Sequence, residues 1–203
     1  KGLFTPFITI PLVIICSTNS VKALEAPRSF KDFLKPELKG KYAFGGMHNS
    51  AGKSLLKSLW FEYGEAPALD FVRNGLALSM PAAAFNAVRN GTVPFAVVPT
   101  IFAKRCDMDN LKMIWPEDGA IPIPSYIAVK NSIDAHSLEF LKEKLLGRDF
   151  QELLAARGVI IPSHPEAADP NSTDKQPGGL LVPDWEFLSG FDHQYFYSQI
   201  DTF

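Results

Sequence analysis

Cysteine is scarce in this chain, and its thiols form no recognisable pair. The sequence contains two cysteines, Cys16 and Cys106, far apart and without CxxC spacing. A cysteine-based metal site or disulfide framework needs closer and more numerous thiols, so neither is expected. We predict that both cysteines are small core residues.

Motifs for hydrolytic chemistry are also missing. The histidines are scattered, at His48, His136, His164 and His193, without an HExxH motif. No GxSxG motif provides a serine nucleophile at a strand-to-helix turn. Glu117 and Asp118 form the one carboxylate pair considered for acid–base work, but adjacent turn residues usually point apart, which favours a plain turn.

Neither sign of charge dominates the chain. It carries 20 Lys and Arg against 22 Asp and Glu, a net charge of −2. Without a basic stripe, nucleic acid is not an expected partner. The hydrophobic content of 46% indicates a globular chain with a sizeable core, and 203 residues correspond to one large domain or two small ones.

The apolar run from Leu3 to Cys16 is too short to span a membrane as a helix. It contains Pro6 and Pro11, and its β-branched residues favour a fully buried strand over a signal peptide. We therefore expect no signal peptide in this chain. A buried strand near its first residue is typical of a fragment.

The prediction of fold and site is built around the stretch from Lys41 to Trp60. Tyr42–Phe44 reads as a buried strand, and Gly45 and Gly46 as a turn with positive φ. Asn49 or Ser50 then caps a helix whose apolar face contains Leu55, Leu56, Leu59 and Trp60. Such a helix N-terminus can hold an anion or a polar ligand group.

This turn differs from a nucleotide-binding P-loop in its spacing. After Gly46 the next glycine of the motif arrives one residue late, at Gly52, before Lys53 and Ser54. Lys53 lies in the first turn of the helix, where its charge opposes the helix dipole unless something negative is nearby.

Alternating strand and helix patterns continue along the chain, separated by many of its 16 prolines. Ser29, Ser79 and Thr100 are expected to cap helices. Strands are predicted at 93–98, 111–115 and 121–129, helices at 68–74, 82–90, 101–105, 134–146 and 150–158, and a long loop at 162–183. This order predicts an α/β domain with helices on both faces of a sheet.

The tail from Asp184 to Phe203 is rich in aromatic residues. A disordered segment would not carry so many rings, so the tail must pack on this domain or on a part absent from the chain.

Four segments together resemble a known family. They are the run 26–41 (APRSFKDFLKPELKGK), Pro94–Ala103 after Arg89-Asn-Gly91, the return segment Pro116–Val129, and the closing segment Trp185–Asp192. Their order is similar to that in the second lobe of type II solute-binding proteins of bacterial ABC importers, in the branch that binds iron(III), thiamine, polyamines and phosphonates. The resemblance covers roughly residues 8–195.

The resemblance implies a fold and a division of the chain. The fold is a periplasmic-binding-protein-like II lobe, a three-layer α/β/α sandwich with a mixed sheet, with the first lobe missing. Residues 1–25 would be the hinge strand (Phe7–Ile15) and its link into the lobe, and 26–130 the ligand-binding lobe. Residues 131–203 would pack back toward the hinge or the missing lobe.

The resemblance also implies a ligand-binding set in the cleft. Its members are His48, Asn49, Ser50, Ala51, Gly52, Lys53, Ser79, Met80, Pro99 and Thr100. Iron(III) binders of the tyrosine class carry adjacent tyrosines in this lobe, whereas Tyr195 and Tyr197 of this chain lie in the tail. Direct iron binding through tyrosines is therefore not expected, and any metal ligands stay unassigned.

The expected function is capture of a small solute outside the cytoplasm, without catalysis or a cofactor. The solute is a metal ion, a chelate or a small charged metabolite. The partner would be an ABC permease in the membrane, and the protein would be a periplasmic or extracellular monomer, with or without a membrane anchor. The alternatives are an α/β enzyme domain that binds a phosphorylated substrate at Gly45–Lys53, and an interaction domain that docks through its tail.

Ser50, Gly52 and the Asn49 side chain are expected to donate hydrogen bonds to the ligand. On the sequence alone, Gly52→Val should abolish ligand binding and leave the domain folded. A binding titration checks this expectation, and unchanged affinity would refute the assignment.

Overall fold

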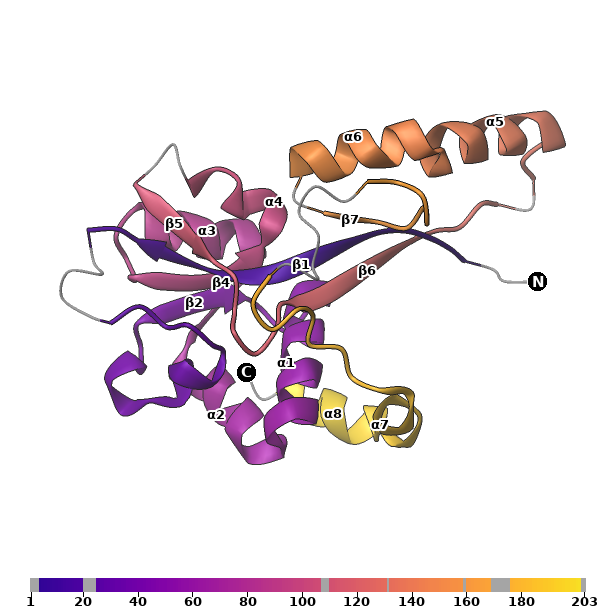
Figure 1. Ribbon diagram of the computed structural model, residues 1–203. Helices are drawn as coiled ribbons and strands as arrows, with labels where there is room; N and C mark the ends of the chain where they lie inside the picture. The colour runs from indigo at the N-terminus through magenta and orange to yellow at the C-terminus, as the bar shows by residue number, and fades with distance from the viewer. Residues whose placement is uncertain are drawn as a thin grey trace.

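A computed structural model describes residues 4–19, 25–106, 110–130, 132–158, 160–168 and 176–201. A mixed sheet of seven strands lies between helices (Figure 1). The strands are β1 (Thr5–Ser17), β2 (Tyr42–Gly45), β3 (Leu76–Leu78), β4 (Phe95–Pro99), β5 (Leu111–Ile114), β6 (Ile121–Ile127) and β7 (Ile161–Pro162).

Eight α-helices lie between or after these strands in the described residues. They are α1 (Ser50–Tyr63), α2 (Glu65–Asn74), α3 (Pro81–Arg89), α4 (Thr100–Ala103), α5 (Ala135–Leu146), α6 (Arg148–Gly158), α7 (Trp185–Gly190) and α8 (His193–Ile200), with short 3₁₀ helices η1 (Lys31–Leu34) and η2 (Pro36–Leu38). Within the described ranges, no helix is both long enough and apolar enough to cross a membrane.

β1 is the central strand and is buried on both faces, as its continuous apolar sequence predicts. Leu12, Ile14 and Cys16 face one hydrophobic core. Val13 and Ile15 face the other. The prediction of a buried strand at the start of the chain, and of a core position for Cys16, is confirmed.

Two helical layers cover the sheet, which confirms the three-layer arrangement. The first core is closed by α1 and α2, which contribute residues such as Leu55 and Phe71. The second is closed by α3 and α4 and includes Phe85 and Cys106. The strand order is β3-β2-β4-β1-β5, in which β2 is parallel to β3 and β4, and β1 is antiparallel to β4 and β5.

The N-terminal half of β1 leaves this lobe as an arm. β4 ends at Pro99, opposite Leu12, whereas β1 continues outward and pairs with β6 from Leu12–Ile121 to Thr5–Ile127. β7 pairs with the same half of β1, and α5 and α6 lie along the arm (Figure 1). Because β1 belongs to both parts, the arm is a direct extension of the sheet.

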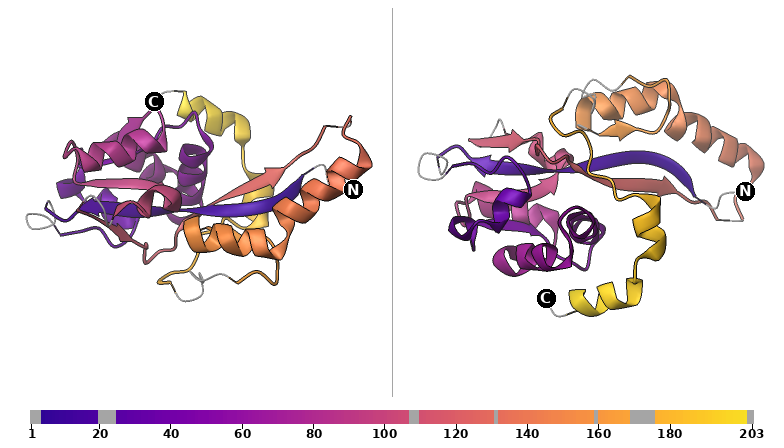
Figure 2. Two further views of the ribbon diagram at one scale, coloured as in Figure 1. Left: turned by 90° about the horizontal axis from the view of Figure 1, so that it is seen from above. Right: turned by 60° about the horizontal axis from the view of Figure 1, so that its bottom comes forward.

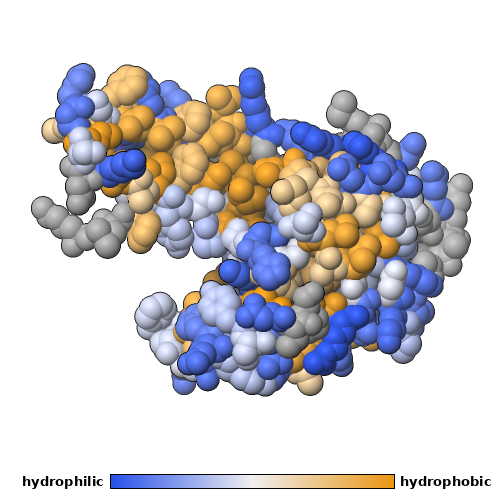
Figure 3. All heavy atoms as spheres, turned by 180° about the vertical axis from the view of Figure 1, so that it is seen from behind, coloured by the Kyte–Doolittle hydropathy of each residue, from blue (hydrophilic) through white to orange (hydrophobic). Residues whose placement is uncertain are grey.

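The arm exposes apolar side chains, which colour it orange in Figure 3. No residue of α5 is buried. The exposed apolar residues of the arm and its helices are Phe4, Tyr126, Val129, Phe140, Leu141 and Leu153. The same view shows the molecule hollowed between the arm and the body below it.

The aromatic tail packs on the lobe itself. Trp60 of α1 contacts Phe191, Tyr195 and Phe196 at ring-centroid distances of 5.6, 6.2 and 6.0 Å. Of the segment 131–203, α5 and α6 follow the arm, and α8 contributes Phe196 and Ile200 to the first core, which also contains Leu12 of β1 and Ile121 of β6. The two helix pairs lie on opposite sides of the β1–β6 ribbon (Figure 2).

Two local features differ from what the sequence analysis led us to expect. The sequence did not predict β3, which has three residues and is largely exposed, so it carries no buried pattern. α2 begins at Glu65 rather than beside Pro67, because Gly64 at φ 86° ends α1 and starts α2 at once.

Glu117 and Asp118 point apart and join other segments. The Glu117 carboxylate lies 3.9 Å from the Arg28 guanidinium at the surface. The half-buried Asp118 carboxylate accepts hydrogen bonds from the Tyr63 hydroxyl at 2.5 Å and from the Phe30 and Lys31 N–H groups at 2.7 and 3.2 Å. The pair therefore connects the β5–β6 turn to η1 and to the end of α1. This agrees with the interpretation of the two carboxylates as parts of a plain turn.

Burial raises the pKa of the Asp118 carboxyl above its ordinary value, and the Tyr63 hydroxyl and the backbone donors oppose that shift. A carboxyl with a raised folded-state pKa binds more protons folded than unfolded. Its contribution to stability therefore falls as the pH rises from the ordinary pKa through the folded one.

We expect Tyr63→Phe to lower the free energy of unfolding by about 1–3 kcal/mol at neutral pH, because a buried carboxylate loses a donor. The loss should shrink at acidic pH, where the carboxyl is protonated and needs that donor less. Denaturant unfolding followed by circular dichroism at both pH values measures the difference.

Tyr42→Phe is the matched control, because the Tyr42 hydroxyl donates to the Phe71 carbonyl and not to a carboxylate. Tyr42→Phe should lower the free energy of unfolding by the same amount at both pH values. A Tyr63→Phe loss that is equally independent of pH would contradict the role given to Asp118.

Candidate functional site

Strand register brings the three predicted turns to one edge of the sheet. In the parallel sheet Gly45 of β2 lies beside Leu78 of β3, and Phe44 lies beside Val97 of β4. The chains that continue from these strands are Met47–Asn49, Ser79–Met80 and Pro99–Thr100. Carboxyl ends of parallel strands are the usual place for a ligand in an α/β sheet, and this edge is also where the arm begins.

The N-terminus of α1 is built as the sequence predicts. Asn49 is its N-cap, and the Asn49 side-chain oxygen accepts a hydrogen bond from the Gly52 N–H at 3.1 Å. The first N–H groups of a helix have no intrahelical acceptor, so those of Ser50 and Ala51 remain available. Ser50 is exposed, whereas Ala51 is buried beneath it.

Two side-chain polar atoms at this edge are buried without a partner among the described residues. They are the Asn49 amide nitrogen and the Thr100 hydroxyl oxygen. Thr100 is fully buried at the start of α4. An unpaired buried polar group costs about 1–3 kcal/mol, so each of these two donors destabilises the free protein.

Thr100 and Ser79 do not cap their helices as predicted. The N-cap of α4 is Pro99 and that of α3 is Met80, and neither helix has a side-chain cap. Prolines at these starts already fix the backbone, so a hydroxyl cap is not required. Thr100 is instead the first residue of α4, and its hydroxyl is free for another contact.

Close packing, rather than positive φ, explains the glycines of the turn. Gly45, Gly46 and Gly52 all have ordinary φ values. A Cβ on Gly45 would lie 2.8 Å from the Pro81 ring, and one on Gly46 would lie 2.7 Å from the Leu78 carbonyl oxygen. The prediction of positive φ at Gly45 and Gly46 was therefore wrong.

Gly52 is also a structural residue. Its N–H is used by the Asn49 cap, and a Cβ there would lie 2.3 Å from the Gly46 carbonyl oxygen. Gly52→Val would therefore displace the turn backbone. The structure contradicts the expectation that this substitution removes binding and leaves the domain intact.

His48 and Ser79 line a small pocket at the β2–β3 edge, and Met80 follows Ser79 in the chain. The pocket, about 110 Å³, is lined by Gly46, Met47, His48, Ala77, Leu78 and Ser79. His48 and Ser79 are exposed, and Met80 beside them is 54% exposed. The sequence missed Met47 and the β3 residues as pocket walls, because a three-residue exposed strand gives no pattern to find.

Lys53 faces away from the turns. Its ammonium lies 5.2 Å from the centre of the Tyr197 ring on α8. One turn later, Lys57 lies over Phe191 and Phe196 at 5.6 and 5.1 Å. Burial, together with the charge of Lys53, lowers the pKa of the Lys57 ammonium. The structure therefore separates Lys53 from the predicted ligand set.

The side chains that the three turns bring together include no carboxylate among the described residues. The ranges that the structure describes also hold no group of three His, Cys, Asp or Glu residues arranged for a metal ion. Backbone N–H groups, hydroxyls, an amide and a histidine remain. Such a set donates hydrogen bonds, and with the positive end of α1 it is suited to an anion.

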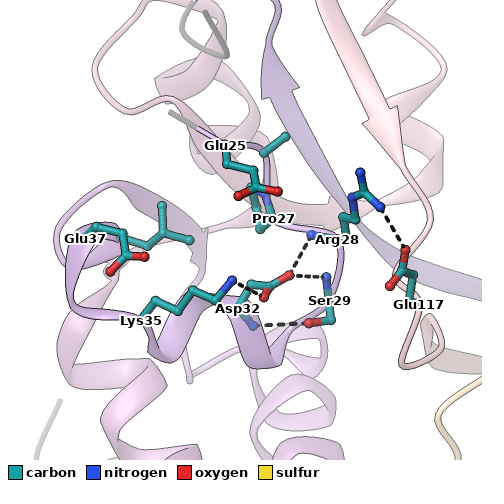
Figure 4. Close-up of a pocket in the computed structure, with 10 residues that line it drawn as sticks. Glu25, Pro27, Arg28, Ser29, Asp32, Lys35, Glu37 and Glu117 are labelled. Carbon is teal, nitrogen blue, oxygen red and sulfur yellow. Dashed lines mark hydrogen bonds and ion pairs between the residues drawn. The ribbon is translucent and has the colours of Figure 1, made fainter. Parts of the chain in front are cut away.

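A larger pocket lies elsewhere, in the segment between β1 and η2. It has a volume of about 330 Å³ and is lined by charged residues including Glu25, Arg28, Asp32 and Lys35 (Figure 4). Arg28 pairs with Glu117, and Lys35 lies 2.8 Å from Asp32. Ser29 and Asp32 exchange hydrogen bonds in the pattern of a capping box, but the N-cap of η1 is Phe30, so Ser29 does not occupy the cap position that the sequence predicts. The two ion pairs involve four of the charged residues that line the pocket.

Comparison with known families gives one match that covers most of the chain. Residues 1–190 match the family described as "Bacterial extracellular solute-binding protein". No curated protein sequence matches the chain.

Solved structures share the fold at low sequence identity. A protein described as "Two-component system protein mediate signal transduction" has a TM-score of 0.81 at 18% identity, and the match covers 98% of this chain and 69% of that one. The periplasmic binding protein AfuA from Actinobacillus pleuropneumoniae, with exogenous fructose-6-phosphate bound, has a TM-score of 0.77 at 15% identity, covering 99% and 67%.

The ferric binding protein from Campylobacter jejuni has a TM-score of 0.74 at 16% identity, covering 98% of this chain and 69% of its own. These likenesses confirm the expected fold class. The chain spans about two thirds of the length of each of these proteins.

We expect Thr100→Val to raise the free energy of unfolding of the free protein by about 1 kcal/mol, because it removes an unpaired buried hydroxyl while keeping the side-chain shape. Denaturant unfolding measures this change. Thr18→Val is the matched control: the Thr18 hydroxyl donates to the Asn110 carbonyl at 2.8 Å, so its loss should not stabilise. A destabilised Thr100→Val would show that the hydroxyl has a partner.

Proposed function

The chain belongs to the family of bacterial extracellular solute-binding proteins, and from that premise we propose that its candidate site binds the phosphate or carboxylate group of a small solute. At the level of the family, the chain is a solute-binding component of an ABC-type importer. We also propose the chemical class of the solute, the residues of the site and the membrane partner.

The unpaired donors at one sheet edge carry the proposal. The N–H groups of Ser50 and Ala51, the Asn49 amide nitrogen and the Thr100 hydroxyl are all donors for which the described residues provide no acceptor. A bound oxyanion supplies several acceptors at once, so it would relieve the cost of these groups. The dipole of the 14-residue helix α1 adds attraction for negative charge.

The ligands of the fold neighbours include both an oxyanion and a metal ion. One neighbour has fructose-6-phosphate bound, and another is a ferric binding protein. In this chain the tyrosines of the tail lie on α8, where the Tyr195 hydroxyl donates to Glu65 at 2.7 Å and Tyr197 lies under Lys53. A phosphorylated or carboxylated metabolite therefore fits the described residues better than a metal ion bound directly.

The enzyme alternative gains no support from the same edge. Catalysis on a phosphorylated substrate would need a positioned acid or base beside the α1 turn. The described side chains there include His48 but no carboxylate to orient it, and Asp118 is committed to Tyr63 and η1. Non-catalytic capture needs only the donors.

We further propose that β1 and β6 form the hinge of a two-lobed protein. The arm starts at the site edge and exposes an apolar surface along α5 and β6. A second lobe that covers this surface could close over the solute by bending the ribbon. Delivery would then be to a membrane permease, and the protein would act as a monomer in the periplasm or at the cell surface.

Asn49→Asp is the sharpest test of the site. Aspartate keeps the cap oxygen that accepts from Gly52, so α1 should form normally. The change replaces a donor with a carboxylate oxygen, and it should weaken binding of a hexose phosphate by roughly tenfold or more. Calorimetric titration with fructose 6-phosphate, citrate and inorganic phosphate, supported by thermal-shift measurements, supplies the affinities.

Asn90→Asp is the matched control, because Asn90 is exposed at the C-terminal end of α3 and changes the net charge equally. It should bind as the unchanged protein does. Equal affinities of Asn49→Asp and Asn90→Asp would contradict the site. A lack of response to all three anions would contradict the proposed solute class.

A further inference from the structure

An aromatic pocket lies at the opposite end of α1 from the candidate site. Its volume is about 360 Å³, within the range of small-molecule sites of roughly 300–1,000 Å³. Four of its lining residues are aromatic: Trp60, Phe187, Phe191 and Tyr195. These rings are fixed by edge-to-face or tilted contacts, such as Trp60–Phe191 at 5.6 Å and Phe187–Phe191 at 4.9 Å.

Three carboxylate residues also line this aromatic pocket: Glu65, Glu186 and Asp192. Glu65 accepts the Tyr195 hydroxyl at 2.7 Å, and Asp192 caps α8 through the Tyr195 N–H at 2.9 Å. The exposed Glu186 carboxylate has no hydrogen bond or ion pair with the residues that the structure describes. The lining therefore carries negative charge that the described protein does not neutralise.

No lysine or arginine is among the described lining residues. The same ring cluster does attract a cation beside the pocket, since the Lys57 ammonium lies 5.6 Å from the Phe191 ring centre. The pocket also lies at the C-terminal end of α1, whose last turn contains no basic residue. A helix C-terminus favours positive charge, and the last turn of α1 itself provides none.

Aromatic faces combined with carboxylates are the chemistry that recognises an organic cation. The ring faces attract an alkylated ammonium group through their quadrupoles, and the carboxylates balance its charge. We propose that the aromatic pocket binds a small organic cation with an alkylated ammonium group, of about the size of choline.

This site is separate from the proposed solute site. Trp60 lies ten positions after Ser50 in α1, which corresponds to roughly 15 Å along the helix axis. The charge preferences are also opposite, since one end of α1 offers donors and the other offers carboxylates. Binding at the aromatic pocket should therefore be unaffected by Asn49→Asp.

The test is a titration of the ¹⁵N-labelled chain with choline chloride, followed by the indole N–H signal of Trp60. Trp115 is an internal reference, because its indole N–H donates to the Gly179 carbonyl at 3.0 Å in another part of the fold. The neutral carbon isostere of choline, in which carbon replaces the ammonium nitrogen, separates charge recognition from simple apolar contact. Sodium chloride at equal ionic strength controls for salt.

We expect a saturable shift of the Trp60 signal with choline and little change at Trp115. Glu186→Gln should raise the dissociation constant about two- to fivefold, as for removal of an exposed charge partner. Glu62→Gln is the matched control, because Glu62 is an exposed glutamate of α1 outside the pocket lining. Phe187→Leu keeps apolar bulk but removes one ring face, so it should weaken choline binding and not that of the isostere.

A choline shift that is weaker in Glu186→Gln and in Phe187→Leu, and unchanged in Glu62→Gln and in Asn49→Asp, supports the proposal. Equal binding of the neutral isostere, or no saturable shift of the Trp60 signal, overturns it. Because Asn49→Asp is included, failure of the cation site and failure of the solute site give different results.

Discussion

The burial of both faces of β1 is the constraint on which the rest of the structure depends. Alternate residues of this strand face two separate cores, so neither helical layer can be removed without exposing apolar surface. β4 and β5 flank its C-terminal half, and β6 and β7 flank its N-terminal half. A single strand therefore sets both the sheet of the lobe and the direction of the arm.

The position of the candidate site follows from that strand. β4 ends at Pro99 opposite Leu12, and β6 begins its pairing at the same residue of β1. The carboxyl edge of the parallel strands is therefore also the base of the arm. A change in the angle of the ribbon would act beside the unpaired donors of Asn49 and Thr100, which is the arrangement that a hinge-closing binder requires.

The sequence predicted the features that local patterns encode. Apolar runs and N-caps identified β1, β2 and the start of α1, where Asn49 caps the helix as expected. It could not predict that Gly46 and Gly52 are needed because two backbone segments nearly touch, since that is a tertiary contact. For the same reason, the direction of the Lys53 side chain could not be predicted from residue spacing, because it depends on where α8 packs.

The packing of α8 on α1 also bears on the two proposed sites, which differ in charge preference. Lys53 and Lys57 lie between the two ends of α1, and their ammonium groups rest on the rings of α8. The tail thus places both charges on its own side of the helix. The N-terminus of α1 is left to attract an anion through its N–H groups and dipole, and its C-terminus keeps the opposite polarity. The aromatic tail therefore affects the charge distribution around α1, and it also covers the core of the lobe.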